Sequence, residues 1–190
     1  MAKNAYLFIG SCCIVLALCG FDNGTLEGGR EGLTDRECVV TCAKEELGVR
    51  EQTGNNDGDR VKLYLAVTGL SEGYPWCAAC MAFVFNICGV ASPNSAYCPD
   101  WFKTNDIIYK RNSSKNDFDK CQQGDLIGIW FSSKGRIAHM GMIESVEGQK
   151  VTTLEGNTTD SDPMNRDGDG FFRKYRLKNQ IYAVSNHIKD

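Results

Sequence analysis

The hydrophobic pattern sets the first 20 residues of this 190-residue chain apart from the rest. Residues 5–18 (AYLFIGSCCIVLAL) are nearly all apolar and follow a single basic residue, Lys3. A membrane-spanning helix needs about 20 apolar residues, so this run is short for a span and matches the apolar core of a signal peptide. We therefore expect residues 1–20 to direct export and not to belong to the fold.

The end of this segment has two interpretations. Residues 16–20 (LALCG) resemble a lipoprotein box, in which Cys19 is lipidated, becomes the new N-terminus and anchors the protein to a membrane. Leu18 departs from the small residue that usually precedes such a cysteine, and plain cleavage is the alternative. In both cases we expect the protein in the periplasm or cell envelope, or secreted. The Gly-rich, polar residues 21–33 are then a linker to the domain.

After the linker the pattern takes on helical periodicity. Thr34–Glu37 (TDRE) is a capping box, which predicts a helix start. Apolar residues then recur at helical spacing up to Gly48, which is suited to a helix end. Two further helices are expected after the turn at residues 54–59, one over residues 60–67 and one from Pro75 or Trp76 to Cys88.

From Gly124 onward the pattern is typical of strands. Short segments rich in β-branched and aromatic residues alternate with turns such as SSKG and RDGDG, which suits an antiparallel sheet. Helices first and strands afterwards predict an α+β fold over residues 34–190, with N-terminal helices packed on a C-terminal antiparallel sheet. The expected strands are 125–131, 139–146, 150–155, 171–175 and 181–185, and residues 91–120 before them look like loop.

Composition and charge narrow the class of protein. Hydrophobic residues make up 42% of the chain and charged residues 24%, which is enough apolar material for a packed core. The net charge of -3 argues against a protein that binds nucleic acid, because phosphate recognition needs a basic surface. The sequence has no run of like charges, so it also lacks a polybasic membrane patch.

The cysteines bear on the chemistry. Of the 10 in the chain, seven lie in the expected domain: Cys38, Cys42, Cys77, Cys80, Cys88, Cys98 and Cys121. Because seven is odd, an oxidising compartment would leave at least one thiol unpaired within the monomer. The spacing fits no particular disulfide framework, so the pairing stays open.

Cys77 is the first candidate for catalysis. Pro75 favours a helix start just before it, which places Cys77 among the unpaired N–H groups at the positive end of the helix. That position favours the thiolate, and the same N–H groups could bind an oxyanion. Taken alone, Cys77 fits a small buried hydrophobe better. The chain has two histidines, and since His187 lies near the chain end, His139 is the expected partner.

A Cys–His pair also needs a group that orients the imidazole. Glu155 and Asn157, in LEGNT, alternate on one face of an extended chain. Both could point toward His139 if the two strands form a hairpin across the turn VEGQK. Either residue by itself would be an ordinary strand-end or turn residue.

Together these motifs resemble the CHAP family of cysteine, histidine-dependent amidohydrolases/peptidases. PWCAA (75–79), GD (124–125), AHMGM (138–142) and EGNT (155–158) stand in the family's order, with 62 residues from Cys77 to His139. The resemblance runs from about Leu47 to Tyr182 and implies a papain-like, NlpC/P60-like fold. It implies Cys77 as nucleophile, His139 as general base and Glu155 as orienting residue, with Asn157 assisting. It further implies hydrolysis of peptidoglycan, as an N-acetylmuramoyl-L-alanine amidase or a peptide endopeptidase.

The resemblance also suggests partners and ligands. Tyr74, Trp76 and Trp101 could line a groove for the peptide or sugar of peptidoglycan. Remodelling of the cell's own wall and attack on a rival's wall both fit, the latter with an inhibitor or immunity protein as a partner. Some CHAP domains bind calcium, and GNNDGD (Asn55, Asn56, Asp57, Asp59) and DGDG (Asp167, Asp169) offer oxygen ligands. Because such clusters are usually turns, we expect no required metal and no other cofactor.

Three other functions compete with this one. Cys77 and Cys80 could form a redox dithiol as in thioredoxin, although that fold needs a strand before the motif and helices precede it here. The domain could bind the cell wall without catalysis, although every expected catalytic residue is present. Cys38, Cys42, Cys77 and Cys80 could hold a structural zinc ion, which needs four converging thiolates. The bulky apolar residue common in the family is replaced here by Cys80, which leaves the redox state open.

Overall fold

The computed structural model describes residues 32–159 and 168–189. The expected signal peptide, Cys19 and nearly all of the expected linker lie outside the described residues. The chain from Leu33 onward forms one compact unit. Within the described residues, no helix is both long enough and apolar enough to cross a membrane.

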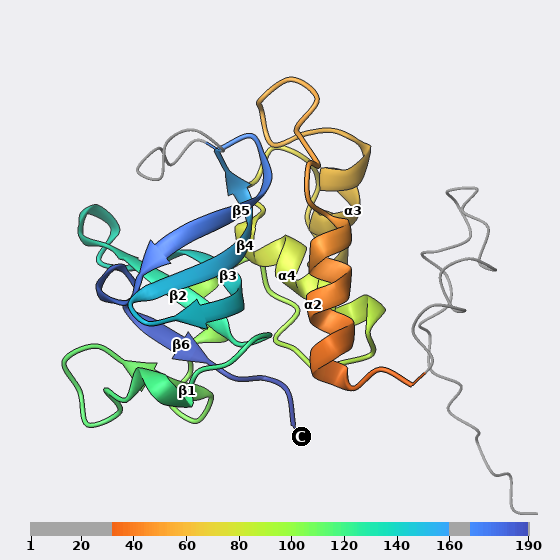
Figure 1. Ribbon diagram of the computed structural model, residues 1–190. Helices are drawn as coiled ribbons and strands as arrows, with labels where there is room; N and C mark the ends of the chain where they lie inside the picture. The colour runs from red at the N-terminus through yellow and green to blue at the C-terminus, as the bar shows by residue number, and fades with distance from the viewer. Residues whose placement is uncertain (1–31, 160–167, 190) are drawn as a thin grey trace, which may run out of the picture. The chain divides into compact units, whose positions relative to one another are not determined.

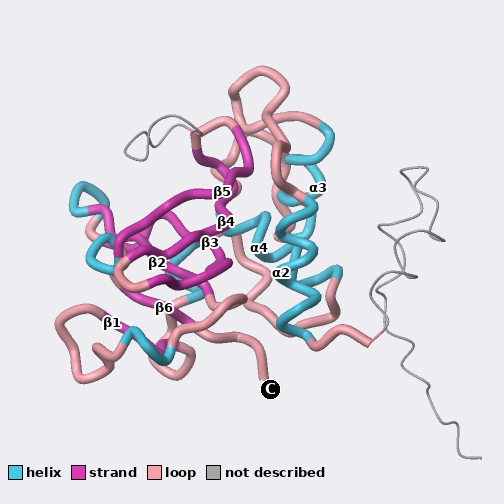
Figure 2. The backbone as a smooth tube through the Cα atoms, viewed as in Figure 1, coloured by secondary structure: helices cyan, strands magenta, loops and turns pink. Residues whose placement is uncertain are grey.

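In the described part of the chain, three α-helices precede a six-stranded antiparallel sheet, which confirms the expected α+β fold (Figures 1 and 2). The helices are α2 (Asp35–Glu45), α3 (Asp59–Val67) and α4 (Cys77–Ile87). The strands, in the spatial order β1-β6-β2-β3-β4-β5, are β1 (Ile107–Lys110), β2 (Leu126–Phe131), β3 (Arg136–Glu147), β4 (Lys150–Thr158), β5 (Gly170–Leu177) and β6 (Ala183–Ser185).

Helix α2 begins where the capping box predicts. The Thr34 hydroxyl accepts a hydrogen bond from the Glu37 N–H, and the Glu37 carboxylate accepts one from the Thr34 N–H. The helix is tied to the sheet by a buried ion pair, in which Arg36 Nη1 lies 3.0 Å from Asp125 Oδ1. Because Asp125 directly precedes β2, this pair joins α2 to the start of the central hairpin.

Helix α4 is the central helix of the domain. It packs on β3 and β4 and also on α2 and α3, and eight of its eleven residues are buried. In Figure 1 it lies between α2 and the sheet. Its sequence is strongly apolar, as expected for a helix that is buried over most of its surface. It begins at Cys77, one or two residues later than expected, and Trp76 is its N-cap.

The sheet contains one strand that the sequence pattern did not indicate. Strand β1 lies within the segment expected to be loop and pairs with β6 at the edge of the sheet. It has four residues, of which only Tyr109 is buried, so its hydrophobic alternation is too short to stand out. Strand β3 begins at Arg136, so His139 lies three residues inside the strand and not at its start.

Two apolar clusters form on the two faces of the sheet. The larger one fills the space between sheet and helices and includes Leu126 of β2. The smaller one includes Ile127, the next residue, together with Tyr109, Phe118 and Cys121. Successive side chains of a strand point to opposite faces, so adjacent residues of β2 serve different clusters.

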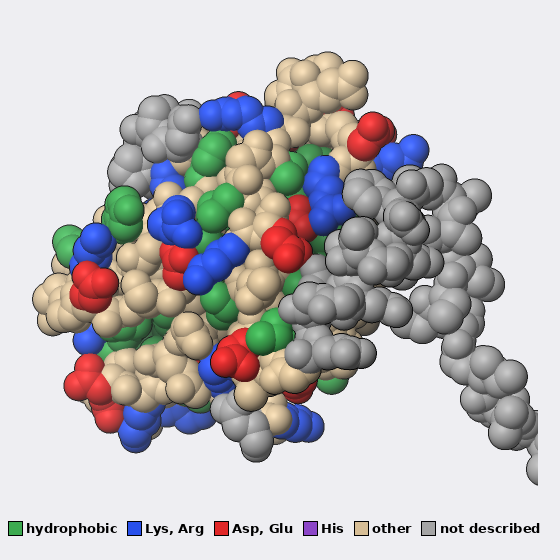
Figure 3. Space-filling view, turned by 45° about the vertical axis from the view of Figure 1, so that its right-hand side comes forward, with side chains coloured by type: hydrophobic (Ala, Val, Ile, Leu, Met, Phe, Trp, Pro, Cys, Tyr) green, Lys and Arg blue, Asp and Glu red, His purple; other side chains and the backbone are tan. Residues whose placement is uncertain are grey.

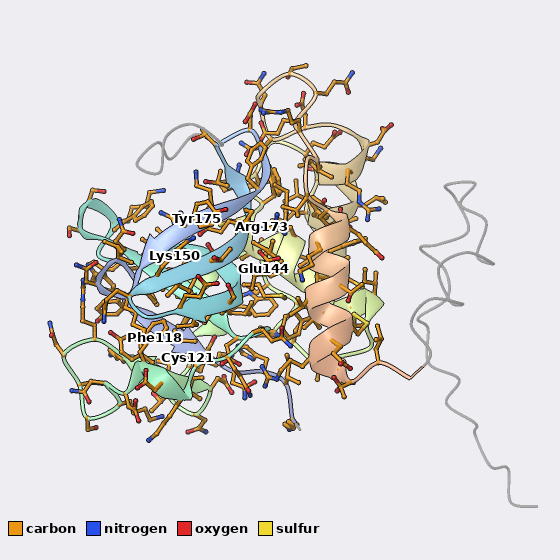
Figure 4. All side chains as sticks on the ribbon, in the orientation of Figure 1. Phe118, Cys121, Glu144, Lys150, Arg173 and Tyr175 are labelled. Carbon is orange, nitrogen blue, oxygen red and sulfur yellow. A yellow bond between two sulfur atoms is a disulfide. The ribbon has the colours of Figure 1, made fainter. Side chains whose placement is uncertain are left out.

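The outer surface of β3–β5 carries paired charges. Arg173 of β5 donates to Glu144 of β3 at 2.8 Å, and Lys150 Nζ lies 4.2 Å from the centre of the Tyr175 ring (Figure 4). On the face shown in Figure 3, basic and acidic side chains are interspersed and neither sign gathers in a broad area. This agrees with the absence of a polybasic run in the sequence.

Candidate active site

The start of α4 places Cys77 at the centre of the candidate site. Cys77 is the first residue of the helix and is 4% exposed. Its Sγ atom lies 3.5 Å from Sγ of Cys98. A hydrogen bond from Cys98 lowers the pKa of Cys77 well below its ordinary value; burial opposes this, and the hydrogen bond and charge of His139 reinforce it. The site therefore favours a thiolate at Cys77.

His139 links Cys77 to Glu155. Its Nε2 atom lies 2.8 Å from Glu155 Oε2, and its side chain is 12% exposed. Since Nε2 faces Glu155, the other ring nitrogen is the one left for Cys77. Burial opposes a charge on the imidazole, but the hydrogen bonds and charges of Cys77 and Glu155 outweigh it and raise the pKa of His139 to about 9. The arrangement favours an imidazolium beside a thiolate.

Glu155 is fully buried, and its carboxylate accepts hydrogen bonds from three neighbouring side chains. Besides His139, it accepts hydrogen bonds from the Thr153 hydroxyl at 2.5 Å and from Arg176 Nε at 2.8 Å and Nη2 at 2.5 Å. Burial alone would raise the pKa of this carboxyl, but Arg176 and His139 hold it far below its ordinary value. Glu155 is therefore ionised and can act only as an acceptor toward His139.

Arg176 and Thr153 are site residues that sequence reasoning missed. Arg176 is 7% exposed and reaches Glu155 from the neighbouring strand β5. The segment FFRKYRL contains two arginines, and the local sequence does not distinguish them. Arg173 points to the surface and pairs with Glu144, whereas Arg176 binds Glu155. Only the pairing of β4 with β5 brings Arg176 to the carboxylate.

Two glycines allow the strands to approach the site closely. A Cβ atom on Gly156 would lie 2.5 Å from Cys80 Sγ and 2.6 Å from the Trp76 ring, so β4 can press against the first turn of α4 only with glycine there. A Cβ atom on Gly141 would lie 2.4 Å from Cγ of Glu155. Neither glycine has a positive φ, so the requirement is for space and not for backbone freedom.

Asn157 does not join His139, contrary to the expectation that it shares a face with Glu155. Its φ is 55°, in the left-handed region, and the β4–β5 register shifts between Glu155 and Thr158. This bulge breaks the alternation of side chains along β4. Its Oδ1 atom instead accepts a hydrogen bond from the Trp76 N–H at 3.2 Å, just before Cys77. Its amide nitrogen donates to Glu51, Asn56 and the Gly168 carbonyl.

Of the three aromatic residues expected to line a substrate groove, only Tyr74 is at the surface, where it is 52% exposed. Trp76 and Trp101 have no exposed area. The Trp76 indole donates to Glu51 at 2.7 Å, and the Trp101 indole donates to the Ser95 carbonyl at 2.9 Å. The expectation that these two tryptophans face substrate is therefore wrong, because both are enclosed in the core.

Cys80 does not form a dithiol with Cys77. Its thiol donates to the Cys77 carbonyl oxygen at 3.1 Å, and burial raises its pKa well above the ordinary value. The sulfur beside Cys77 is that of Cys98. This arrangement gives the redox alternative no support.

The cysteines proposed for zinc are not brought together either. Cys38 forms a disulfide with Cys88, and Cys42 Sγ lies 3.3 Å from Cys88 Sγ. Among the described residues, these three form the one His/Cys/Asp/Glu cluster compact enough to hold a metal ion. Cys77 and Cys80 do not belong to it.

The oxygen-rich loops considered for calcium are engaged with the chain itself. Asp57 accepts from the N–H of Thr53 at 2.8 Å, Asn56 accepts from Asn157 at 3.0 Å, and Asp169 pairs with Arg50 at 2.7 Å. Asp59 is the first residue of α3 and Asn55 donates to Thr53. Asp167 lies outside the described residues.

One family model matches the part of the chain that contains this site. The CHAP domain model matches residues 69–157, a range that contains Cys77, His139 and Glu155. Among curated proteins, none matches the sequence significantly. Similar solved structures include a protein described as similar to lipoprotein, NLP/P60 family, from Staphylococcus aureus subsp. aureus Mu50. Its sequence is 14% identical to that of this chain, and the TM-score is 0.44. The match covers 90% of this chain and 43% of that chain.

Two structures of Ly7917 are also similar. The one with the hydrolyzing product of MDP has 14% identity, covers 80% of this chain and 63% of that chain, and has a TM-score of 0.39. The other has 14% identity, covers 78% and 61%, and has a TM-score of 0.38. The present chain thus spans less than two thirds of the length of each of these proteins. The CHAP domain model thus matches the stretch that holds Cys77, His139 and Glu155, and this stretch is similar to the family that its sequence motifs resemble.

Proposed function

We propose that this chain is an exported cysteine hydrolase that cleaves amide bonds of bacterial peptidoglycan with Cys77, His139 and Glu155. The observation that carries the proposal is the contact of His139 with Glu155 at 2.8 Å beside the Cys77 thiol at the start of α4. The CHAP match supports the substrate class. The reaction is that of an N-acetylmuramoyl-L-alanine amidase or of a peptide endopeptidase.

In the first step the Cys77 thiolate attacks the carbonyl carbon of the amide. The carbon–nitrogen bond then breaks, and the imidazolium of His139 gives its proton to the leaving amine. Cys77 is left as a thioester of the acyl group. The high pKa of His139, about 9, keeps that proton available at neutral pH.

In the second step His139, now neutral, takes a proton from a water molecule. The resulting hydroxide attacks the thioester, the carboxylic acid leaves, and the thiolate–imidazolium pair is restored. Glu155 stays ionised throughout and holds the imidazole by its Nε2–H. Arg176 and Thr153 keep that carboxylate in place.

The first turn of α4 supplies a place for the oxyanion. The N–H groups at the start of a helix lack intrahelical partners and carry the positive end of the helix dipole. Cys77 is the first residue of an eleven-residue helix, so its own N–H and those that follow lie next to the attacking sulfur. They are suited to stabilise the negative oxygen that forms when the thiolate adds to the carbonyl.

Export and anchoring form part of the proposal. The apolar run at residues 5–18 supports an export signal, and LALCG supports lipidation at Cys19. Tyr74, exposed three residues before Cys77, is the remaining aromatic candidate for substrate contact. An anchored enzyme fits remodelling of the cell's own wall, and a secreted one with an immunity partner fits attack on another cell.

The test is digestion of purified peptidoglycan by the purified protein, with mass spectrometry of the released fragments. We expect muropeptides from the wild type and none from Cys77→Ala. The fragment masses identify the bond that is cut. Cys121→Ala is the matched control, because Cys121 is a buried thiol of the smaller apolar cluster, away from the site.

A wild type that releases no fragments, or a Cys77→Ala variant that releases the same fragments, contradicts the proposal. Cys80→Ser separates hydrolysis from dithiol chemistry: the hydrolase keeps its activity, whereas a dithiol enzyme loses insulin reduction. For localisation, fractionation of cells and incorporation of labelled lipid are compared between the wild type and Cys19→Ala. Loss of lipid label and release from the membrane in Cys19→Ala are expected if Cys19 is the anchor.

A further inference from the structure

Cys98 lies beside the sulfur that we propose as the nucleophile, although nothing in the sequence pattern pointed to it. It is the first residue of the 3-10 helix η2 (Cys98–Trp101), in the long connection between α4 and β1. Its Sγ atom is 3.5 Å from Sγ of Cys77, within hydrogen-bond range for two sulfur atoms. Both thiols are buried, at 3% and 4% exposure, so bulk water does not replace this contact.

The position of Cys98 is fixed by the packing of η2. Trp101, at the end of this helix, has no exposed area and contacts Phe85 of α4 with ring centres 5.7 Å apart. The Trp101 indole also donates to the carbonyl of Ser95, before the helix. Trp101 thereby connects the end of η2 to α4 and to the chain just before η2, which restricts movement of Cys98 away from Cys77.

The charges around the two sulfurs decide which thiol holds the proton. Cys77 is faced by His139 and by the Met140 N–H from β3, both of which favour its thiolate. Cys98 is buried beside that thiolate, which raises the pKa of Cys98 despite the nearby Arg136. Cys80, from α4, is also pushed toward its neutral form by burial and by Cys77. Cys98 therefore stays an S–H group while Cys77 is charged.

We propose that Cys98 is a positioning residue of the active site, whose S–H donates a hydrogen bond to the Cys77 thiolate and holds that sulfur ready for attack. The thiolate then has three donors: the His139 imidazolium, the Met140 N–H and the Cys98 thiol. When His139 gives its proton to the leaving amine, the other two donors remain. The proposal deepens the proposed function, since it rests on Cys77 being the nucleophile.

The test measures the thiolate directly. Alkylation of Cys77 by iodoacetamide is followed by mass spectrometry of the Cys77 peptide between pH 4 and pH 10, in the full chain and in Cys98→Ala and Cys98→Ser. Cys98→Ala loses the donor, and the pH midpoint of Cys77 alkylation is expected to move upward by about one pH unit. The reason is that loss of one hydrogen bond to a charged group changes the pKa of that group by about one unit. Cys98→Ser keeps a donor, so its midpoint is expected near the wild-type value.

Two outcomes overturn the proposal: an unchanged midpoint in Cys98→Ala, or a midpoint in Cys98→Ser shifted as far as in Cys98→Ala. If the smaller side chains disturb folding, Cys98→Thr and Cys98→Val form a second pair with nearly the same shape, one with a donor and one without. Equal midpoints in that pair also overturn it. Alkylation does not require hydrolysis, so a protein inactive on peptidoglycan still gives a result, and the two proposals fail separately.

Discussion

The side chain of Glu155 passes over Gly141 to reach His139. Gly141 lies two residues after His139 on β3, and a Cβ atom there would lie 2.4 Å from Cγ of Glu155. Real Cβ atoms do not approach other atoms so closely. The missing side chain of Gly141 is therefore a condition for the contact between the carboxylate and the imidazole.

Gly141→Ala is expected to move Glu155 away from His139. Relief of the clash needs a shift of about 1 Å, and a misplacement of that size in a catalytic group costs up to about 100-fold in rate. We expect a comparable fall in kcat/KM on peptidoglycan fragments, with Cys77 still present and the protein folded by circular dichroism. The control is the Glu155→Ala background, where Gly141→Ala should cost little further activity. An equal loss in both backgrounds would show that the glycine acts elsewhere.

Arg176 is expected to matter through Glu155. Arg176→Met leaves a buried carboxylate without its two strongest donors, so the pKa of Glu155 rises and its hold on His139 weakens. We expect kcat/KM to fall by about 10- to 100-fold. Removal of one partner of a buried ion pair should also lower the free energy of unfolding by about 3–5 kcal/mol, measured by urea denaturation.

Arg173→Met is the matched control for Arg176, because it lies on the same strand but pairs with Glu144 at the surface (Figure 4). It should change activity and stability little, since surface ion pairs contribute less than about 1 kcal/mol. The double variant Arg176→Met/Glu155→Gln should be no less active than Glu155→Gln. A purely additive loss would mean that Arg176 acts independently of Glu155.

Part of this site could be predicted because its signals are local. The capping box fixed the start of α2, and Pro75 indicated a helix start close to Cys77. The turn VEGQK indicated the β3–β4 hairpin, and this hairpin brings His139 and Glu155 together. Each of these inferences needs only neighbouring residues or one short turn.

The rest depends on contacts that no short segment contains. Arg176 reaches Glu155 only through the register of β4 with β5, and Cys98 reaches Cys77 only through the packing of η2 on the core. The prediction that Asn157 points toward His139 is wrong because Asn157 itself has a left-handed φ, and the bulge there breaks the regular alternation of β4. The prediction that Trp76 and Trp101 line a substrate groove is wrong because the same aromatic residue types occur in substrate grooves and in cores, and the sequence does not distinguish them.

The pH dependence of hydrolysis is expected to report on the His139–Glu155 pair. Cys77 and Glu155 together outweigh burial and raise the pKa of His139 to about 9, so the protonated imidazole persists up to about pH 9 and is lost above it. The rate should therefore fall on the alkaline side near pH 9. Glu155→Gln removes the negative charge, so the pKa of His139 falls and the alkaline limb should move to lower pH by about 1–3 units.

The control for this shift is Glu144→Gln, because Glu144 pairs with Arg173 and Lys44 at the surface and does not touch the site. Its profile should match that of the wild type in both limbs. If the alkaline limb of Glu155→Gln lies at the same pH as that of the wild type, a group other than Glu155 controls the proton of His139. The measurement is kcat/KM against pH with a soluble muropeptide.

Oxidation is expected to join Cys77 to Cys98, since their sulfur atoms are only 3.5 Å apart. Hydrogen peroxide converts the Cys77 thiolate to a sulfenic acid and leaves hydroxide; the Cys98 thiol then attacks that sulfur, a disulfide forms and water leaves. Activity should disappear as a Cys77–Cys98 linked peptide appears in mass spectra, and dithiothreitol should restore both. In Cys98→Ala the loss should become irreversible as Cys77 oxidises further, whereas Cys80→Ala should behave like the wild type. A disulfide-linked Cys77 peptide in the mass spectra of oxidised Cys98→Ala, lost on addition of dithiothreitol, would point to a different partner for Cys77.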